Sequence, residues 1–133
     1  MNLTILLVDN EADFLQTRAE FLTREGYQVI TANSPAAARQ SLKTQTPDIL
    51  ITDIRLLDDD DERDTTGLTL VQDADPQIPK IVLTGFPSVN AVRHALRPHN
   101  NGQAPAVDFI GKEEGPEAML AAVRRAIAVH IEN

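Results

Sequence analysis

The stretch DILITD, residues 48–53, places an aspartate directly after a short apolar run rich in isoleucine. The run lacks the alternation of apolar and polar residues that marks a strand with one solvated face, so it predicts a strand covered on both faces. Four other runs share this character: LTILLV at 3–8, QVITA at 28–32, KIVLT at 80–84 and VDFI at 107–110. The sequence therefore predicts five buried strands.

Helical patterns separate these runs. Apolar residues recur with a helical period over 12–24, and Ser34 and Pro35 supply an N-cap and a first helical residue for a second helix. Three more helices are expected at 68–74, directly after Gly67, near 88–96 and near 116–131. Strands that alternate with helices predict an α/β fold, a three-layer doubly wound (flavodoxin-like) domain whose five-stranded parallel sheet has the order 2-1-3-4-5, with five helices.

Length and composition limit the function classes. We expect residues 1–133 to form a single domain, with no output domain among them, because two domains this small would bury too little apolar surface. The absence of cysteine excludes disulfides and thiolate metal ligands. The N-terminal apolar run is too short for a signal peptide or a membrane span, so we expect a cytoplasmic protein without membrane contact. The net charge of −8 argues against direct nucleic-acid binding.

Polar side chains follow the strands at the edge where an open α/β sheet binds its ligands. They are Asp9, Asn10 and Glu11 after the first strand, Asp53 after the third, Thr84 at the end of the fourth and Lys112 after the fifth. Clustered carboxylates repel one another, and the usual remedies are a hard divalent cation such as Mg²⁺ and a lysine ammonium group. This set suits phosphoryl transfer to a carboxylate, with Asp53 as the nucleophile.

The strings ILLVDNE, DILITDIRL, IVLTGFPS and VDFIGK, in this order and at successive strand ends, make the whole chain resemble the receiver domain of two-component response regulators. The resemblance implies phosphorelay signal transduction in which Asp53 accepts a phosphoryl group that Thr84 and Lys112 contact. The implied Mg²⁺ ligands are Asp9, Asn10 and Asp53, with Glu11 as a further candidate. No enzymatic activity is expected beyond assistance to the chain's own aspartyl phosphorylation and dephosphorylation.

The same resemblance implies a conformational switch and a set of partners. Thr84 would move toward the phosphoryl group and Phe109 would turn inward, which changes the face formed by the helix at 88–96, the strand at 107–110 and the helix at 116–131. The implied partners are a histidine kinase or a histidine phosphotransfer protein as phosphoryl donor, and a downstream output domain or protein. A homodimer through the same face is a further expectation.

The chain departs from the family pattern in its acidic pair and after its lysine. Asn10 stands where the family usually has a second acid, and its amide oxygen can ligate Mg²⁺ without supplying charge, so cation affinity should fall unless Glu11 contributes. Glu113 follows Lys112 where the family commonly has a proline after a cis peptide bond. Because a cis bond before a non-proline residue costs about 2.5–4 kcal/mol, we expect a trans bond or a strained cis bond.

Two connections are also longer than the family pattern. Gly67 lies fourteen residues after Asp53, and acidic residues fill the surplus. The run Asp58–Asp61 does not match a calcium-binding EF-hand loop, because the required glycine and glutamate are absent at the sixth and twelfth positions. We interpret 58–64 as a solvated loop with at most an electrostatic influence. The second long connection is 97–105, RPHNNGQAP.

Two other functions are considered. The first is a phosphorylation-independent pseudo-receiver that acts as a protein-interaction module. The second is an aspartate-nucleophile phosphohydrolase, which Arg55 disfavours because haloacid-dehalogenase-like enzymes usually carry a second aspartate at that position. Arg55 and Phe86, two residues beyond Asp53 and Thr84, occupy positions that tune how easily water reaches an acyl phosphate in receiver domains.

Overall fold

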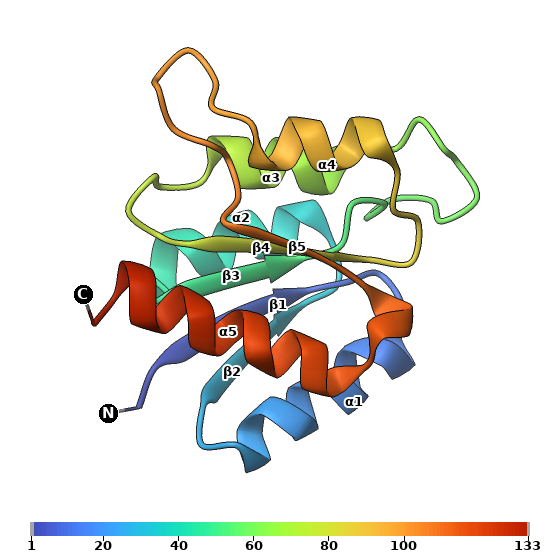
Figure 1. Ribbon diagram of the computed structural model, residues 1–133. Coiled ribbons are helices and arrows are strands. Elements are labelled where there is room, and N and C mark those ends of the chain that lie inside the picture. Colours follow the sequence, from blue (N-terminus) through green and yellow to red (C-terminus); the bar gives the residue numbers. More distant parts are fainter. Residues whose placement is uncertain (1, 133) are drawn as a thin grey trace.

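The computed structural model describes residues 2–132 and forms a five-stranded parallel sheet with helices on both faces (Figure 1). The strands are β1 (Thr4–Val8), β2 (Gln28–Ala32), β3 (Ile49–Thr52), β4 (Lys80–Thr84) and β5 (Asp108–Gly111). Their order in the sheet is β2-β1-β3-β4-β5. This order confirms the doubly wound topology predicted from the sequence.

Helices connect successive strands and cover both faces of the sheet. They are α1 (Ala12–Arg24), α2 (Pro35–Gln45), α3 (Thr66–Asp73), α4 (Val89–Leu96) and α5 (Pro116–His130), and a short 3-10 helix, η1, covers Lys112–Glu114. Figure 1 shows α1 and α5 on one face of the sheet and α2, α3 and α4 on the other. Within residues 2–132, none of these helices combines the length and the hydrophobicity needed to cross a bilayer.

The sheet buries apolar side chains on both faces. Ile5, Leu7 and Ile51 point toward α1 and α5, whereas Leu6 and Leu50 point toward the opposite layer of helices. Every residue of β3 and β4 is buried, which explains why their sequences lack the alternation of a half-solvated strand. Each fully buried leucine or isoleucine contributes about 1.5–3 kcal/mol, so the fold is stabilised mainly at the centre of the sheet.

Helix α3 begins at Thr66 and includes Gly67, whereas the sequence predicted a start after this glycine. The reason is a close backbone contact. The Gly67 N–H donates to the carbonyl oxygen of Ile54 at 2.8 Å, so the first turn of α3 lies directly against the chain that leaves β3. A side chain at this position would collide with that chain, and the glycine therefore belongs to the helix as its contact residue.

The segment between β3 and α3 is folded around Asp64, which is only 8% exposed. Its carboxylate accepts hydrogen bonds from the backbone N–H groups of Leu57 and Asp58, both at 2.8 Å, and from the backbone and hydroxyl of Thr66. Burial alone raises the pKa of Asp64, but these hydrogen bonds outweigh it and hold the pKa below its ordinary value. The interpretation of 58–64 as solvated throughout was therefore wrong at Asp64.

Candidate functional site

The polar residues predicted from the strand ends meet at the carboxyl edge of the sheet. β1 lies beside β3, and the backbone N–H of Asp53 donates to the Val8 carbonyl at 3.0 Å, which brings the end of β3 against the end of β1. Asp9 is 2% exposed and Asp53 is 1% exposed. Thr84, at the end of β4, is fully buried. Two buried carboxylates thus share one pocket and require a compensating charge.

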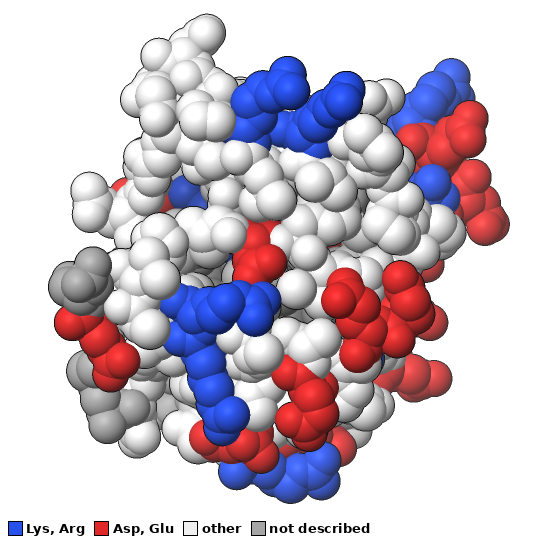
Figure 2. All heavy atoms as spheres, viewed as in Figure 1, with Lys and Arg blue, Asp and Glu red and all other residues white. Residues whose placement is uncertain are grey.

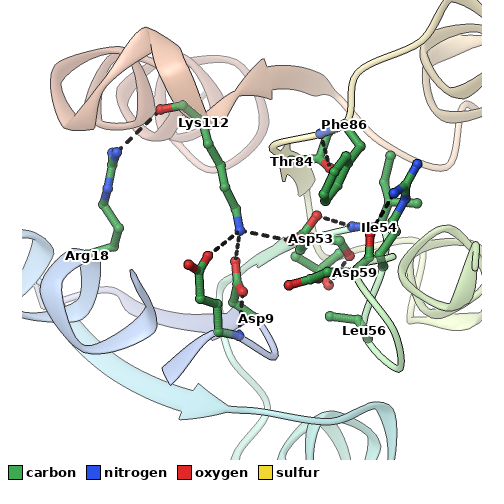
Figure 3. A network of polar contacts seen from close by, with 12 residues as sticks. Asp9, Arg18, Asp53, Ile54, Leu56, Asp59, Thr84, Phe86 and Lys112 are labelled. Atoms are coloured by element: carbon green, nitrogen blue, oxygen red, sulfur yellow. Dashed lines mark hydrogen bonds and ion pairs between the residues drawn. The ribbon is translucent and has the colours of Figure 1, made fainter. Parts of the chain in front are cut away.

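Lys112 supplies that charge. Its Nζ lies 2.7 Å from Asp9 Oδ2 and 2.9 Å from Asp53 Oδ2, and the exposed Glu11 lies at 3.6 Å (Figure 3). The peptide bond to Glu113 is trans, because residues 2–132 contain no cis peptide bond, and this confirms the first of the two expected outcomes. Lys112 therefore reaches both aspartates with a trans peptide bond to Glu113.

Two residues of α1 that the sequence did not single out support Lys112. The Phe14 ring centroid lies 4.2 Å from Lys112 Nζ, a distance at which an ammonium group is attracted to the ring. The Arg18 guanidinium lies 4.7 Å from the same ring and donates to the Lys112 carbonyl at 3.5 Å. The sequence carried no signal for this arrangement, because Phe14 has the same apolar pattern as any residue that faces the core.

The shared pocket shifts the pKa values of its residues. Burial raises the pKa of Asp9 to about 6, and the nearby carboxylate of Asp53 adds to this, although Lys112 and the backbone N–H of Glu11 act in the opposite direction. Burial lowers the pKa of Lys112, but the hydrogen bonds and charges of Asp9 and Asp53 outweigh it and raise the pKa overall. The lysine therefore stays charged at neutral pH.

We expect Asp9→Asn to stabilise the protein at pH 7.5 in the absence of divalent cations. The pKa of Asp9 is about 6 in the folded protein and 3.8 in the unfolded chain, so protonation of Asp9 stabilises the folded state. This stabilisation is complete below pH 3.8 and is lost as the pH rises through 6. The loss amounts to about 3 kcal/mol at most, and Lys112 keeps Asp53 as a partner in the variant. Urea unfolding should show a gain of about 1–3 kcal/mol at pH 7.5 that disappears at pH 4. Destabilisation at pH 7.5 would contradict the assignment.

Thr84 and Phe109, the expected switch residues, lie on the neighbouring strands β4 and β5. The Thr84 hydroxyl accepts a hydrogen bond from the backbone N–H of Phe86 at 3.1 Å. Phe109 is half-buried and packs against a cluster that includes Ile54 and Ala95, between β3, α4 and β5. Thr84 is therefore on the strand next to β3, and Phe109 lies one strand further, on the side of the domain that α4 covers.

The side chains of Arg55 and Phe86 stack on one another. The Arg55 guanidinium carbon lies 3.8 Å from the Phe86 ring centroid, and its Nη1 donates to the carbonyl oxygen of Asp59 at 2.6 Å. Phe86 is 41% exposed, so the stack is partly open to solvent. These contacts join the loops that follow β3 and β4.

In the part of the chain that the structure describes, three buried side-chain oxygens in the segments that follow β1 and β3 have no hydrogen-bond donor. Within residues 2–132, the buried oxygens without a donor are Asn10 Oδ1, Asp53 Oδ2 and Asp59 Oδ1, although Asp53 Oδ2 has the ion pair with Lys112. The same residues contain no group of three or more His, Cys, Asp or Glu side chains placed to hold a metal ion. Carboxylate and amide oxygens are the ligands that Mg²⁺ takes from proteins, so the residues present fit this cation with an amide among its ligands.

A doubly wound sheet with a lysine-bridged pair of aspartates at its carboxyl edge defines the CheY-like class of flavodoxin-like domains. The family model described as "Response regulator receiver domain" matches residues 5–124. The chain therefore belongs to the response regulator receiver domain family, whose members act in two-component phosphorelay signalling. This membership confirms the resemblance inferred from the strand-end motifs.

Individual relatives agree. The chain is 36% identical over 124 residues to the transcriptional regulatory protein GlrR of Escherichia coli (strain K12), covering 92% of this chain and 26% of the relative. It is 31% identical over 128 residues to the alginate biosynthesis transcriptional regulatory protein AlgB of Pseudomonas putida, covering 94% of this chain and 26% of the relative. The chain thus spans about a quarter of the length of these relatives.

Solved structures show the same fold. A CheY-like response regulator receiver domain protein from Methanospirillum hungatei JF-1 superimposes with a TM-score of 0.78 at 25% identity, covering 96% of this chain and 95% of that one. NtrX from Brucella abortus, in complex with ATP, gives a TM-score of 0.79 at 26% identity. The match covers 98% of the present chain and 28% of the NtrX chain. The match therefore extends over nearly all of the present chain.

Proposed function

We propose that this receiver domain accepts a phosphoryl group on Asp53 and transmits the event as a change of packing around Thr84 and Phe109. The observation that carries the proposal is the position of Lys112, whose ammonium group lies within 3 Å of an oxygen of each buried aspartate. Asp53 is also oriented from the other side, because its Oδ1 accepts the backbone N–H of Ile54 at 2.7 Å. Oδ2 is left facing the pocket.

The chemistry is a displacement at phosphorus. An oxygen of Asp53 forms a bond to the phosphorus atom while the bond to the donor nitrogen breaks, and the donor imidazole leaves with its electron pair and takes up a proton. Lys112 remains beside Asp53 and balances negative charge on the phosphoryl oxygens. Mg²⁺ held by Asp9, Asn10 and Asp53 would neutralise further charge on these oxygens.

The signal is read as a shift between two packings of the same domain. The Thr84 hydroxyl accepts a hydrogen bond from Phe86 N–H in the present structure, and a phosphoryl group on Asp53 would give its O–H a charged acceptor. Movement of Thr84 toward that acceptor would free space beside β5, into which the half-buried Phe109 can turn. The energy of the new hydrogen bond is the bias that shifts the population.

The donor that we propose is a histidine kinase or a histidine phosphotransfer protein, and the recipient of the signal is an output domain or a separate protein. The relatives support an output function in transcription, since GlrR and AlgB are named as transcriptional regulatory proteins and are about four times as long as the matched region. Phosphoryl transfer to and from its own aspartate is the only chemistry assigned to the domain.

A homodimer through α4, β5 and α5 forms a further part of the proposal. Figure 2 shows basic side chains over α4, where Arg93 and Arg97 are exposed. Leu96 at the end of α4 is 38% exposed and Val107 before β5 is 37% exposed, while Arg125 of α5 pairs with Asp108 of β5 at 2.7 Å. This face thus combines apolar residues with charges of both signs, as protein interfaces do.

The proposal is tested with a small phosphodonor. Incubation with phosphoramidate and Mg²⁺ should add one phosphoryl mass to the intact protein, and beryllofluoride should perturb the NMR signals of residues around Thr84 and Phe109. A pseudo-receiver would show neither change. A phosphohydrolase would turn over an aryl phosphate continuously, but the guanidinium of Arg55 stacks on Phe86 and has no proton-transfer function at neutral pH.

Phe86→Ala should shorten the lifetime of the phosphoryl group on Asp53. The substitution removes the ring that Arg55 stacks on and opens the solvent side of the pocket, so water reaches the acyl phosphate more easily. We expect hydrolysis to be faster by about threefold to tenfold, equivalent to roughly 1 kcal/mol of barrier. The measurement is the decay of the phosphorylated species by mass spectrometry. Leu57→Ala, at a residue that is 69% exposed, is the control, and equal decay of both variants would contradict the shielding role.

A further inference from the structure

Asp59, one of the acidic residues in the long connection between β3 and α3, lies beside Asp53 (Figure 3). We propose that Asp59 is an additional ligand of the divalent cation bound beside Asp53, and that it supplies the negative charge that Asn10 lacks. The inference deepens the proposed function, because it concerns the cation that assists phosphoryl transfer, but it is tested by cation binding alone.

The placement of Asp59 is the first observation. Its neighbours Asp58 and Asp60 are exposed, whereas Asp59 is half-buried, and Figure 3 shows it beside Asp53. Its Oδ1 is buried and accepts no hydrogen bond from the residues at 2–132. A buried carboxylate oxygen without a donor is costly unless a cation or an ordered water completes it. A solvated loop residue would instead be exposed, as Asp60 is.

The loop holds Asp59 in this position from two sides. The Arg55 guanidinium binds the Asp59 carbonyl at 2.6 Å and is itself stacked on Phe86. Asp64 then closes the loop by accepting the backbone N–H groups of Leu57 and Asp58 at 2.8 Å. The hydrogen bonds to Asp59 involve its backbone, so its carboxylate is free to bind a ligand while the main chain stays fixed.

The charges of the pocket are the second observation. Asp9 Oδ1 accepts the N–H of Glu11 at 2.8 Å and Oδ2 lies 2.7 Å from Lys112, so Asp9 can offer a cation only the lone pairs that these contacts leave. The remaining oxygens without a hydrogen-bond donor belong to Asn10, Asp53 and Asp59, which are one neutral amide and two carboxylates. Lys112 balances only one of the two charges of Asp9 and Asp53, and a carboxylate at Asp59 adds to the negative charge that attracts a cation. Such a set of oxygens binds Mg²⁺ or Mn²⁺.

The test is direct cation binding by the unphosphorylated protein. Mn²⁺ binding is followed by the loss of the free-ion signal in electron paramagnetic resonance, and Mg²⁺ is added as competitor. Asp59→Asn should weaken the affinity for both ions about tenfold, because a neutral oxygen replaces a charged ligand. Asp60→Asn is the matched control, since it removes the same charge at an exposed position one residue away. Its cation affinity should stay within about twofold of the parent protein, because solvent and salt screen the charge of an exposed residue.

A second pair of variants tests whether Asp59 replaces the missing charge at position 10. Asn10→Asp in the Asp59→Asn background should restore the affinity of the parent protein to within about twofold. Equal affinities of Asp59→Asn and Asp60→Asn, or no recovery in the double variant, would overturn the inference. Phosphorylation by phosphoramidate is scored separately: a protein that binds Mn²⁺ through Asp59 but never gains a phosphoryl mass refutes only the proposed function.

Discussion

Asp53→Asn should abolish phosphoryl incorporation from phosphoramidate. The parent protein is expected to gain one phosphoryl mass per chain, because Asp53 Oδ2 faces the pocket beside Lys112 while Oδ1 is held by Ile54 N–H. The asparagine side chain has nearly the same shape but carries no nucleophilic carboxylate. The readout is the intact mass of the protein after incubation with Mg²⁺ and the donor, with a loss of signal of about a hundredfold or more, as expected when the nucleophile itself is removed.

The control for this experiment is Asp60→Asn, which changes the same kind of side chain in an exposed position. This variant should be phosphorylated to the level of the parent protein. A phosphoryl adduct of unchanged yield in Asp53→Asn would show that another residue is the acceptor, and peptide mapping would then locate it. The exposed acids of the loop, Asp58 and Asp60, are the sites to examine first because they are accessible to the donor.

Gly67→Ala should cost the protein a large part of its stability. A Cβ atom built on Gly67 would lie 2.7 Å from the carbonyl carbon of Asp53 and 2.8 Å from Cα of Ile54, and it would overlap the Asp53 carbonyl oxygen outright. These are backbone atoms, so no side chain can rotate away, and either α3 or the end of β3 must move. We expect a loss of about 3 kcal/mol or more in urea unfolding, at or above the upper range for overpacked sites.

Gly85→Ala is the matched control for this prediction. Gly85 also follows a strand of the site, but a Cβ atom there would meet only Cδ of Lys112 at 3.7 Å, an ordinary contact. Its cost should stay below about 1 kcal/mol. Equal stabilities of the two alanine variants would mean that the approach of α3 to β3 is looser than the structure indicates.

The fold could be predicted from the sequence because each strand is a short apolar run that ends in a polar residue. The run before Asp53 identified β3 to within one residue, and the same pattern identified the other strands. The start of α3 could not be placed, because Gly67 is a weak helix former and also the contact residue against β3. Such a contact depends on the tertiary structure, and the local pattern gives no sign of it.

Some residues of the site could likewise be predicted from the sequence, and others could not. Asp9, Asp53 and Lys112 were predictable because parallel strands end at one edge, and their side chains must then converge. The acidic loop was not, since Asp58, Asp59 and Asp64 look alike in the sequence but differ in the structure. Asp58 is exposed and Asp59 is half-buried beside Asp53. Asp64 is buried, and its carboxylate accepts four hydrogen bonds. Which acid takes which place depends on how the backbone turns, and that is set by side-chain to backbone hydrogen bonds.

The anchoring of the loop by Asp64 has a mechanical consequence. The Asp64 carboxylate binds the backbone N–H groups of Leu57, Asp58 and Thr66. We therefore expect the loop and the first turn of α3 to move together as a rigid unit. The Gly67 N–H donates a hydrogen bond to the Ile54 carbonyl, which connects this unit to the chain directly after Asp53. A protein that bound the acidic loop would therefore shift the backbone next to Asp53, and a movement of Asp53 would in turn displace the loop.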